Sequence, residues 1–439
     1  MASQTTDTSD SGHREISDIG HRLRVLRQTK GLSYAALGKL AGVSNAMVMY
    51  IETGHTTPGL EIVIKLSRAL GVDPRWFAFG NSEPERHITQ FLGTPECDAI
   101  QAIFDLQAIL NRRSGTIDVT YNYLDPLGAA QWVKLLEESA FAALVEAVPL
   151  QDAFVTIAKL VGNQPVDILG LGAGTARHEL GLVKRFLARH HSDIRLLLLD
   201  ISHALLSLAS QEAMVQIPAK WNVPLLCVLG NFQALPTYAH VLDGQGPRCK
   251  VVCMFGYTFA NLENELRFVE KNLSWLPADS LLLLDVPVVF ARADSPLEIE
   301  QRDPALSNRR PSDWQRRAEE FATGPIRRYA DGVLDVTLEK VLDNRATTVP
   351  GSYAITASAT VRFADGTTGN FSLGCTKRYE INGLAKSLDA LGWNYTSHWT
   401  YADGTNMLCL FQRAKPTSWR KRRTSASPAK RTTRRVDKL

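Results

Sequence analysis

Five short, continuous apolar segments between residues 166 and 288 most constrain the fold of this chain. They read VDILGL, IRLLLLDI, PLLCVLG, KVVCMFG and SLLLLDVPV, and helical stretches separate them. A strand that is apolar along its whole length is covered on both faces, as strands of parallel sheets are. The alternation therefore predicts an α/β domain with a parallel sheet. Three later segments, LDVTLEKVL, SYAITASATVRFA and TNMLCLFQR, are expected as antiparallel strands that close or extend that sheet.

The first apolar segment leads into a glycine-rich turn, GLGAG, and then into a helix. Gly170, Gly172 and Gly174 are suited to a sharp turn where a ligand approaches the backbone. Asp200 ends the next strand, where a carboxylate can accept hydrogen bonds from ribose hydroxyls. The third glycine of the dinucleotide-binding pattern G-x-G-x-x-G is missing, which argues against a dinucleotide.

This part of the chain resembles the class I S-adenosylmethionine-dependent methyltransferases, and among them the histidine Nα-methyltransferase-like family. The supporting motifs are DILGLGAGTARHE, LLLLDIS followed by ALLSLA, VLGNF, VVCMFGYTFANL, LPADSLLLLDV and TKRYEINGLAKSLDALGW, over about residues 100–413. The resemblance implies a Rossmann-like methyltransferase domain and S-adenosyl-L-methionine as cofactor. The residues it assigns to cofactor binding are Gly170, Gly172, Gly174, Asp200, Asn231 and Phe232. The last two would flank the adenine.

The resemblance also points to residues for the methyl acceptor. Asn261 would contact an amino-acid substrate, with a loop cap as the alternative role. Tyr121 and Tyr123 lie where the family's substrate-binding tyrosines occur, with simple packing as the alternative. The positions from which the family reads an imidazole ring with Glu and Ser correspond here to Leu373 and Cys375. A site without those groups does not select a polar ring over an apolar side chain. We therefore expect a less polar, small amino-acid-like amine instead of histidine as the methyl acceptor.

The N-terminal part of the chain predicts a compact group of short helices at about residues 19–30, 34–41, 45–52 and 61–69, with one more opening at Pro74. Ser33 and Ser44 stand at N-cap positions, and Gly42 lies in the turn between the second and third helices. These features, with LRVLRQTKGLS, LGKLAGVS, IETGHTTPGLE and LSRALGVD, resemble the Cro/C1 (XRE) repressor family over residues 19–80. The resemblance implies an all-α helix-turn-helix domain whose third helix enters the major groove of duplex DNA.

Within that helix the residues expected at the DNA are Ser44, Asn45, Ala46, Met49 and Tyr50. Asn45 is suited to pair with adenine, and Met49 to contact a thymine methyl group. The reading surface is unusually apolar, which suggests either relaxed DNA specificity or a domain reused for protein contact. The resemblance places a second set of residues in the domain core: Leu37, Ala41, Val43, Val48, Ile51 and Leu66.

Taken together, the segments predict six parts: a disordered N-terminus (1–17), a helix-turn-helix domain (18–80), a linker (81–96), a helical substrate or lid region (97–160), the methyltransferase-like domain (161–413) and a disordered tail (414–439). The tail holds ten Lys and Arg against one Asp, a charge of +9 within a chain of net +4. It can contact phosphates without reading bases.

Cysteine spacing and hydropathy exclude two further classes. Of six cysteines only Cys249 and Cys253 are close in sequence, and no second pair completes a tetrahedral site, so no metal is expected. No apolar run reaches the ~18 residues of a membrane span, and the polar N-terminus does not resemble a secretory signal. We expect a cytoplasmic protein with no membrane partner.

The two resemblances leave alternative functions open. One is a transcriptional regulator, expected as a homodimer, with an active small-molecule N-methyltransferase domain. The other is a non-catalytic regulator that uses the cofactor-binding fold as a sensor or dimerisation module. Methylation of nucleic acid fits less well, because FGYTFANL stands where amino-methylating DNA enzymes have a [DNS]-P-P-[YFW] signature. Methyl transfer needs mainly alignment, so no catalytic residue is assigned.

Overall fold

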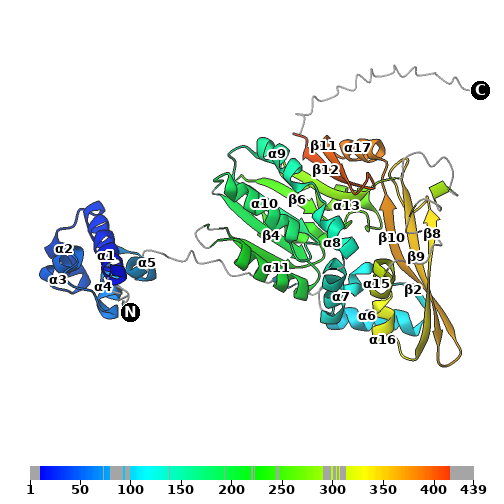
Figure 1. The fold of residues 1–439 in the computed structure, drawn as a ribbon, viewed down its shortest axis with the longest axis horizontal. Helices are drawn as coiled ribbons and strands as arrows, with labels where there is room; N and C mark the ends of the chain where they lie inside the picture. Colours follow the sequence, from blue (N-terminus) through cyan, green and yellow to red (C-terminus); the bar gives the residue numbers. More distant parts are fainter. Residues whose placement is uncertain are drawn as a thin grey trace, which may run out of the picture.

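The computed structural model describes residues 10–72, 74–79, 92–93, 99–137, 139–191, 193–218, 221, 223–243, 247–289, 298–299, 303, 306 and 313–415 (Figure 1). Residues 1–9, most of the expected linker and residues 416–439 of the expected tail lie outside these ranges.

Five helices form the N-terminal domain, drawn in blue in Figure 1: α1 (Asp10–Thr29), α2 (Tyr34–Ala41), α3 (Asn45–Glu52), α4 (Leu60–Leu70) and α5 (Pro74–Phe79). Four of them agree closely with the sequence prediction. The first begins nine residues before the expected start, so residues 10–17 are helical and the prediction of disorder for them is wrong. This segment contains a single apolar residue, Ile16, and therefore gives no periodic signal of a helix.

The turn between α2 and α3 is tight. The Ser33 and Ser44 hydroxyls cap the two helices by accepting the amides of Ala36 and Met47, both at 3.1 Å. Gly42 ends α2 in the left-handed conformation, with φ of +65°. The helices approach so closely that a Cβ on Gly38 would lie 2.8 Å from the Val43 carbonyl oxygen.

The core of the N-terminal domain combines an apolar cluster with one buried ion pair. Of the core residues that the resemblance assigned, all are buried except Val43, which packs partly buried against the cluster. Glu52, whose side chain is fully buried, receives two hydrogen bonds from Arg27, at 2.6 and 2.9 Å. This bidentate pair joins the end of α3 to α1, and the Arg27 guanidinium lies 4.2 Å from the centre of the Tyr34 ring.

The second domain is built on an eight-stranded sheet in the order β1-β5-β4-β3-β6-β7-β12-β11. Its strands are β1 (Leu92–Gly93), β3 (Val166–Leu171), β4 (Ile194–Asp200), β5 (Leu225–Leu229), β6 (Cys249–Met254), β7 (Leu281–Pro287), β11 (Trp393–Tyr401) and β12 (Asn406–Arg413). Strands β1 and β3–β7 are parallel, and β12 and β11 extend the sheet as an antiparallel hairpin. The fold-class prediction, an all-α domain followed by an α/β Rossmann-like domain, is confirmed.

The central strands contribute side chains to a core on each face of the sheet. Ile168 and Leu198 belong to one apolar cluster, and their neighbours Leu169 and Leu199 belong to the other. Helices α9 (Leu150–Val161), α10 (Arg177–Ala188) and α11 (His203–Gln216) supply residues to the first cluster. The 3₁₀ helix η3 (Phe232–Tyr238), α12 (Ala239–Leu242), α13 (Glu265–Asn272) and α17 (Ile381–Ala390) supply the second. Burial on both faces explains why these strands are continuously apolar.

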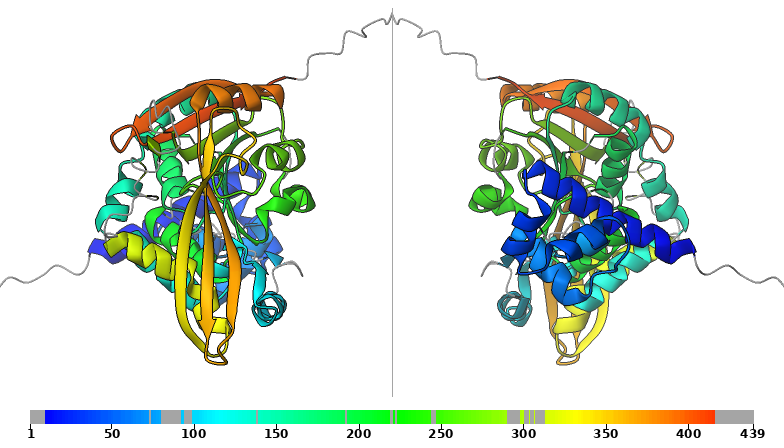
Figure 2. Two further views of the ribbon diagram at one scale, coloured as in Figure 1. Left: turned by 90° about the vertical axis from the view of Figure 1, so that its right-hand side faces the viewer. Right: turned by 90° about the vertical axis from the view of Figure 1, so that its left-hand side faces the viewer.

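A second, four-stranded sheet was not expected. Its order is β2-β10-β9-β8, from β2 (Ser114–Thr116), β8 (Val333–Asp343), β9 (Tyr353–Phe363) and β10 (Thr368–Arg378). Figure 2 shows β8, β9 and β10 as a long narrow ribbon. Two of the three late segments therefore form their own sheet, and only TNMLCLFQR extends the main one, as β12. Sequence alternation reveals a strand but not the sheet in which it pairs.

The helical region expected at residues 97–160 is divided between the two sheets. It contains α6 (Ala99–Asn111), the 3₁₀ helix η2 (Val119–Asn122), α7 (Pro126–Glu137), α8 (Ser139–Glu146) and α9. Strand β2 joins the second sheet, whereas α9 packs on the main one. Two further helices, α15 (Asp313–Ala322) and α16 (Gly324–Tyr329), lie beside this region.

None of the described helices has both the length and the apolar composition to cross a bilayer on its own. The one pair of described helices that has them jointly, Pro126–Glu137 with Ala142–Val161, is bent by 75°.

Candidate active site and nucleic-acid interface

A cavity of about 1610 Å³ opens at the carboxyl ends of β3, β4 and β6. One wall consists of the glycine turn after β3, the end of β4 and the loop after β6. The other consists of residues from α7, α15 and strands β8–β10 of the second sheet. In open α/β sheets, ligands bind beyond the carboxyl ends of the strands, which makes this cavity the candidate active site.

The three glycines of the turn have different surroundings. Gly172 and Gly174 line the cavity and adopt positive φ, +65° and +53°. A Cβ on Gly172 would lie 2.9 Å from the Thr258 methyl group and 3.3 Å from the Phe232 ring, so a side chain here would close the space. Gly170 lies inside β3 and is not among the residues that line the cavity.

Asp200 is placed directly beside the glycine turn. Its carboxylate oxygens accept the amide of Gly174 at 2.8 Å and the amide of Ser202 at 2.9 Å. Burial raises the pKa of the Asp200 carboxyl above its ordinary value, and these amide hydrogen bonds act in the opposite direction. Asp200 lines the cavity, so the remaining lone pairs of the carboxylate are available to a ligand's hydroxyl groups.

A second buried acid, Glu179, was missed by the sequence reasoning. It lies in the first turn of α10, lines the cavity and is only 2% exposed. Its Oε1 would be 2.8 Å from a Cβ on Gly170, so Gly170 makes room for this carboxyl group rather than for a ligand. Burial raises the pKa of Glu179 to about 8. An acid in the first turn of a helix is common, so the sequence offered no signal of its burial.

The two residues predicted at the adenine have different positions. Phe232 lines the cavity, beside Gly172, and its ring meets the Phe268 ring edge-on at 5.7 Å between centroids. Asn231 does not line the cavity. Its side-chain oxygen accepts the Gln233 amide at 2.9 Å, which caps η3.

The structure separates the two candidate tyrosines. Tyr121 packs against the apolar cluster of the second sheet and is not part of the cavity wall. Tyr123 lines the cavity and forms an aromatic cluster with Trp132 and Phe321, at centroid distances of 5.3–5.7 Å. This aromatic cluster lies beside the glycine turn, because a Cβ on Gly174 would be 3.8 Å from the Trp132 indole nitrogen. Burial and the nearby Asp200 raise the pKa of the Tyr123 phenol, which therefore stays protonated at neutral pH.

Asn261 lies in the cavity wall, in the loop after β6, and its side-chain oxygen accepts the Thr376 hydroxyl at 2.8 Å. A buried lysine from the second sheet fixes this loop. Lys377 bonds the Leu262 carbonyl and forms an ion pair of 3.2 Å with Glu265, and both side chains are fully buried. The loop that presents Asn261 is therefore held by β10.

The positions that correspond to the family's imidazole-reading pair also line the cavity. Leu373 packs against the apolar cluster of the second sheet, and burial raises the pKa of the Cys375 thiol. Neither side chain is a strong hydrogen-bonding group. This part of the wall is therefore less polar than an imidazole-binding site requires.

A strained residue lies in the loop after β6. Tyr257 has a φ of +65°, which is costly for a bulky side chain. Its phenol donates to the Asn406 side-chain oxygen at 2.9 Å. The preceding residue, Gly256, donates its amide to Asp285 at 2.9 Å, and Tyr401 donates to the other oxygen of Asp285 at 2.5 Å. Burial raises the pKa of Asp285 to about 6. No sequence motif indicated this arrangement.

Cysteines and metal-ligand groups form no further site in the described part of the chain. Cys227, Cys249, Cys253 and Cys409 are buried free thiols, and Cys375 is half-buried. Among the residues placed by the structure, no group of three His, Cys, Asp or Glu side chains could hold a metal ion.

In the N-terminal domain, all five residues predicted at DNA are exposed at the start and along one side of α3. Met49 and Tyr50 are 38% and 46% exposed. Asn45 is exposed as well, and its side-chain oxygen accepts the Ala46 amide at 3.0 Å. The surface of α3 is therefore accessible, largely apolar and uncharged.

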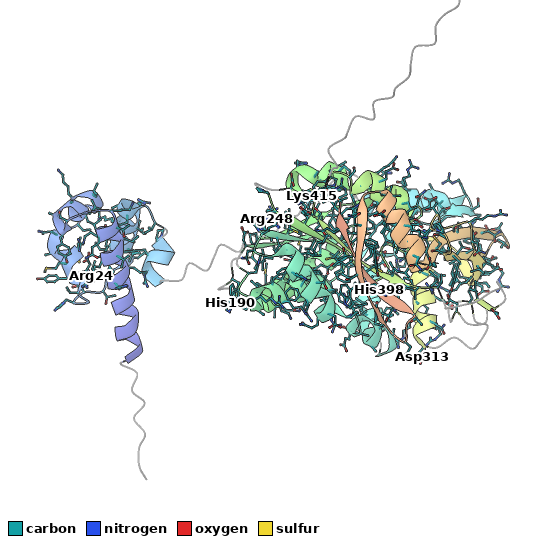
Figure 3. All side chains as sticks on the ribbon, turned by 90° about the horizontal axis from the view of Figure 1, so that it is seen from above. Arg24, His190, Arg248, Asp313, His398 and Lys415 are labelled. Carbon is teal, nitrogen blue, oxygen red and sulfur yellow. The ribbon has the colours of Figure 1, made fainter. Side chains whose placement is uncertain are left out.

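Three arginines of α1 form hydrogen bonds or an ion pair within the domain. Arg22 donates to the carbonyls of Phe77 and Ala78, at 3.1 and 2.9 Å. Arg24, labelled in Figure 3, donates to the Glu52 carbonyl at 3.2 Å, and Arg27 pairs with the Glu52 side chain. Hydrogen bonds within the domain therefore occupy part of the donor groups of these three arginines, which leaves fewer of them for DNA phosphates.

Comparison with known families decides the class of this domain. The family described as Helix-turn-helix matches residues 23–77. Residues 23–77 are a helix-turn-helix domain. Its sequence is similar to Repressor protein C2 of Salmonella phage P22, with 36% identity over 63 residues, and the chain spans 29% of that repressor's length. Among solved structures, the crystal structure of P22 c2 repressor in complex with a synthetic operator is 36% identical. It covers 14% of this chain and 96% of that chain, with a TM-score of 0.14.

A larger share of the chain is similar to solved structures at lower sequence identity. The chain is similar to a S-adenosylmethionine-dependent methyltransferase from Clostridium acetobutylicum, with 13% identity and a TM-score of 0.34. That similarity covers 65% of this chain and 99% of the other.

Proposed function

We propose that this protein is a DNA-binding transcriptional regulator with an S-adenosyl-L-methionine-dependent N-methyltransferase domain, and that its acceptor is a small amino-acid-like amine. The observation that supports it best is the pairing of Asp200 with the glycine turn at the carboxyl end of a parallel sheet. This is the place where a carboxylate can hold a ribose while glycines leave room for the rest of a nucleoside.

The residues around the turn fit this cofactor. Gly172 and Gly174 leave a space that side chains would fill, Phe232 offers a ring surface for an adenine, and Asp200 offers lone pairs for ribose hydroxyls. Glu179, when ionised, would favour a cationic amino group near the turn. S-adenosyl-L-methionine supplies, when bound, an electrophilic methyl group on a sulfonium.

The opposite wall of the cavity suits an amine. Tyr123, Trp132 and Phe321 place aromatic surfaces beside Gly174, where they can attract a cationic or partly cationic group and exclude water. Across the cavity, on the wall that holds the glycine turn, Asn261 is held by Thr376 and would orient the acceptor by a hydrogen bond from its amide NH₂ group. Alignment of this kind is the main requirement of an in-line displacement.

Isothermal titration of the full chain with S-adenosyl-L-methionine tests the proposal. We expect binding, and Asp200→Ala should weaken it by about 10- to 100-fold, because the variant loses charge-assisted hydrogen bonds to ribose. Asp389→Ala, which removes an equal charge from the exposed side of α17, is the matched control and should bind normally. Equal affinity in the Asp200 variant and in this control would refute the cofactor assignment.

For the helix-turn-helix domain, we propose binding to duplex DNA as a homodimer. A single recognition helix covers one half-site, so specificity requires two domains at half-sites about 34 Å apart. We expect residues 414–439 to add affinity without sequence preference, through contacts of Lys and Arg with phosphates.

A titration of the chain's own upstream DNA and of random duplex, at two salt concentrations, tests this part. Asn45→Ala should reduce the preference for the upstream DNA by about 10-fold or more, since one bidentate base contact is lost. Deletion of the tail should weaken binding to both duplexes alike and flatten the salt dependence. Failure of the unaltered chain to discriminate between the duplexes would instead favour a protein-contact role for this domain.

One observation favours the alternative, a non-catalytic regulator that senses the cofactor. Leu373 and Cys375, on the cavity wall opposite the glycine turn, offer few polar groups to a methyl acceptor, as expected of a chain that has kept the cofactor site without a substrate site. Mass spectrometry with histidine and with less polar amino acids distinguishes the two functions. Methylation of the latter supports an enzyme, whereas cofactor binding without any methyl transfer supports a sensor.

A further inference from the structure

We propose that Arg378 and Asn406 form a carboxylate-binding subsite in the cavity, so that the methyl acceptor is an amine that also has a free carboxylate. The inference rests on the proposed function and goes further, since it names the residues that select the substrate class.

The first observation concerns the hydrogen bonds of Arg378, the last residue of β10. Its Nε donates to Asp303 at 3.1 Å, and Asp303 also accepts the Tyr353 hydroxyl at 3.2 Å. The Nη1 atom of the same guanidinium is buried and has no hydrogen-bond partner among the described residues. A buried donor without a partner is destabilising, and Arg378 lines the cavity, so a bound acceptor atom would complete its hydrogen bonds.

The second observation concerns Asn406, which also lines the cavity and is only 3% exposed. Its side-chain oxygen accepts the Tyr257 phenol, so its NH₂ group is the part left to bond a ligand. The Tyr257 phenol is protonated at neutral pH, and burial raises its pKa further, so its hydrogen bond to Asn406 Oδ1 maintains this orientation of the amide. Asn406 pairs with Pro287 in the register of β12 and β7, and the Pro287 carbonyl accepts the amide of Tyr379, the residue after Arg378, so Arg378 and Asn406 stand at the same edge of the cavity.

The two free groups are both donors, one of them charged. Two donors of this kind match the two oxygens of a carboxylate. Asp303 balances the single positive charge of the guanidinium but bonds only its Nε, so the Nη1 donor still selects a ligand with an acceptor atom.

The location also fits an acceptor. Tyr257 directly precedes Thr258, whose methyl group lies beside Gly172 of the glycine turn. The strained backbone of Tyr257, with its φ of +65°, thus connects the subsite to the proposed cofactor site. Strain of this kind persists where the surrounding contacts enforce it, and it is typical of functional sites.

The test uses the full chain, saturated with S-adenosylhomocysteine, and matched pairs of probes: L-leucine, L-phenylalanine and L-tryptophan, each against its carboxamide. Binding is measured by calorimetry. We expect at least one amino acid to bind about 10- to 100-fold more tightly than its amide, because only the acid offers a negative charge and two acceptor oxygens to the two donors. Arg378→Gln should reduce this ratio to about 2 or less, whereas Arg362→Gln, an exposed arginine of β9, should preserve it.

Arg378→Gln leaves Asp303 buried without its cation, so the double variant Asp303→Asn with Arg378→Gln removes both charges and guards against unfolding. Loss of the acid-to-amide ratio in both variants, with normal binding of S-adenosylhomocysteine, supports the subsite. No preference for acids in the unaltered chain, or an unchanged ratio in the variants, overturns it and indicates that water alone satisfies Arg378. If S-adenosylhomocysteine itself does not bind, the proposed function fails instead.

Discussion

Replacing Glu179 by glutamine should remove a pH dependence from the stability of the α/β domain. Glu179 is 2% exposed, and burial raises its pKa to about 8 from an ordinary value of 4.5. Between these values the folded state keeps a proton that the unfolded chain has lost. Raising the pH therefore favours unfolding, by about 1.4 kcal/mol for each pH unit.

This slope sets the size of the expected effect. From about pH 5.5 to about pH 7.5 the burial of Glu179 should lower the free energy of unfolding by about 2 to 3 kcal/mol. Glutamine resembles the protonated acid in shape and has no charge to lose. Over this pH range the free energy of unfolding of the unaltered chain should therefore fall by that amount relative to the free energy of unfolding of Glu179→Gln.

Urea unfolding followed by tryptophan fluorescence measures the effect, because only Trp76 of the eight tryptophans lies in the helix-turn-helix domain. Glu270→Gln, on the exposed side of α13, is the matched control and should change stability by less than about 0.5 kcal/mol at every pH. Parallel pH profiles for Glu179→Gln and the unaltered chain would show that Glu179 is ionised in the folded protein, contrary to the reasoning.

Other outcomes test the remaining packing arguments. Glu52→Ala should cost the helix-turn-helix domain about 3 to 5 kcal/mol in thermal or urea unfolding, because it leaves Arg27 without its buried partner. Glu61→Ala, which breaks an exposed pair, is the control and should leave the unfolding transition nearly unchanged. Gly172→Ala should abolish cofactor binding in calorimetry while the fold persists by circular dichroism, and unchanged affinity would contradict the close contact with Thr258. Trp132→Ala should raise the acceptor KM more than it raises the cofactor Kd, and the opposite order would place the indole at the cofactor instead.

Local physical chemistry explains which parts of the fold were predictable. The central strands are continuously apolar because both faces of the sheet are covered, and that property is visible in a single segment. The caps Ser33 and Ser44 were equally visible, since a cap acts within three residues. The second sheet was not, because β2 pairs with β10 across more than 250 residues of chain and no local pattern records that pairing.

The candidate site likewise contains residues that the sequence indicated and residues that it did not. Asp200 and Gly172 belong to a motif in which spacing alone implies the position, and both line the cavity. Glu179, Tyr257 and Arg378 were missed because their roles depend on burial, on a left-handed backbone and on an unpaired guanidinium atom. Each of these properties arises only when distant elements pack together.

The apolar cores of the two domains share no residue. The core of the helix-turn-helix domain uses residues between 19 and 77, and the clusters of the α/β domain use residues between 106 and 411. Each domain should therefore melt in its own calorimetric transition, and a ligand should raise only the transition of the domain that binds it. Operator DNA and S-adenosyl-L-methionine can then be used separately to measure thermodynamic coupling between the two domains. A cofactor that also raised the melting temperature of residues 23–77 would reveal a coupling free energy between methyl-donor supply and gene control, and its size could be read from that shift.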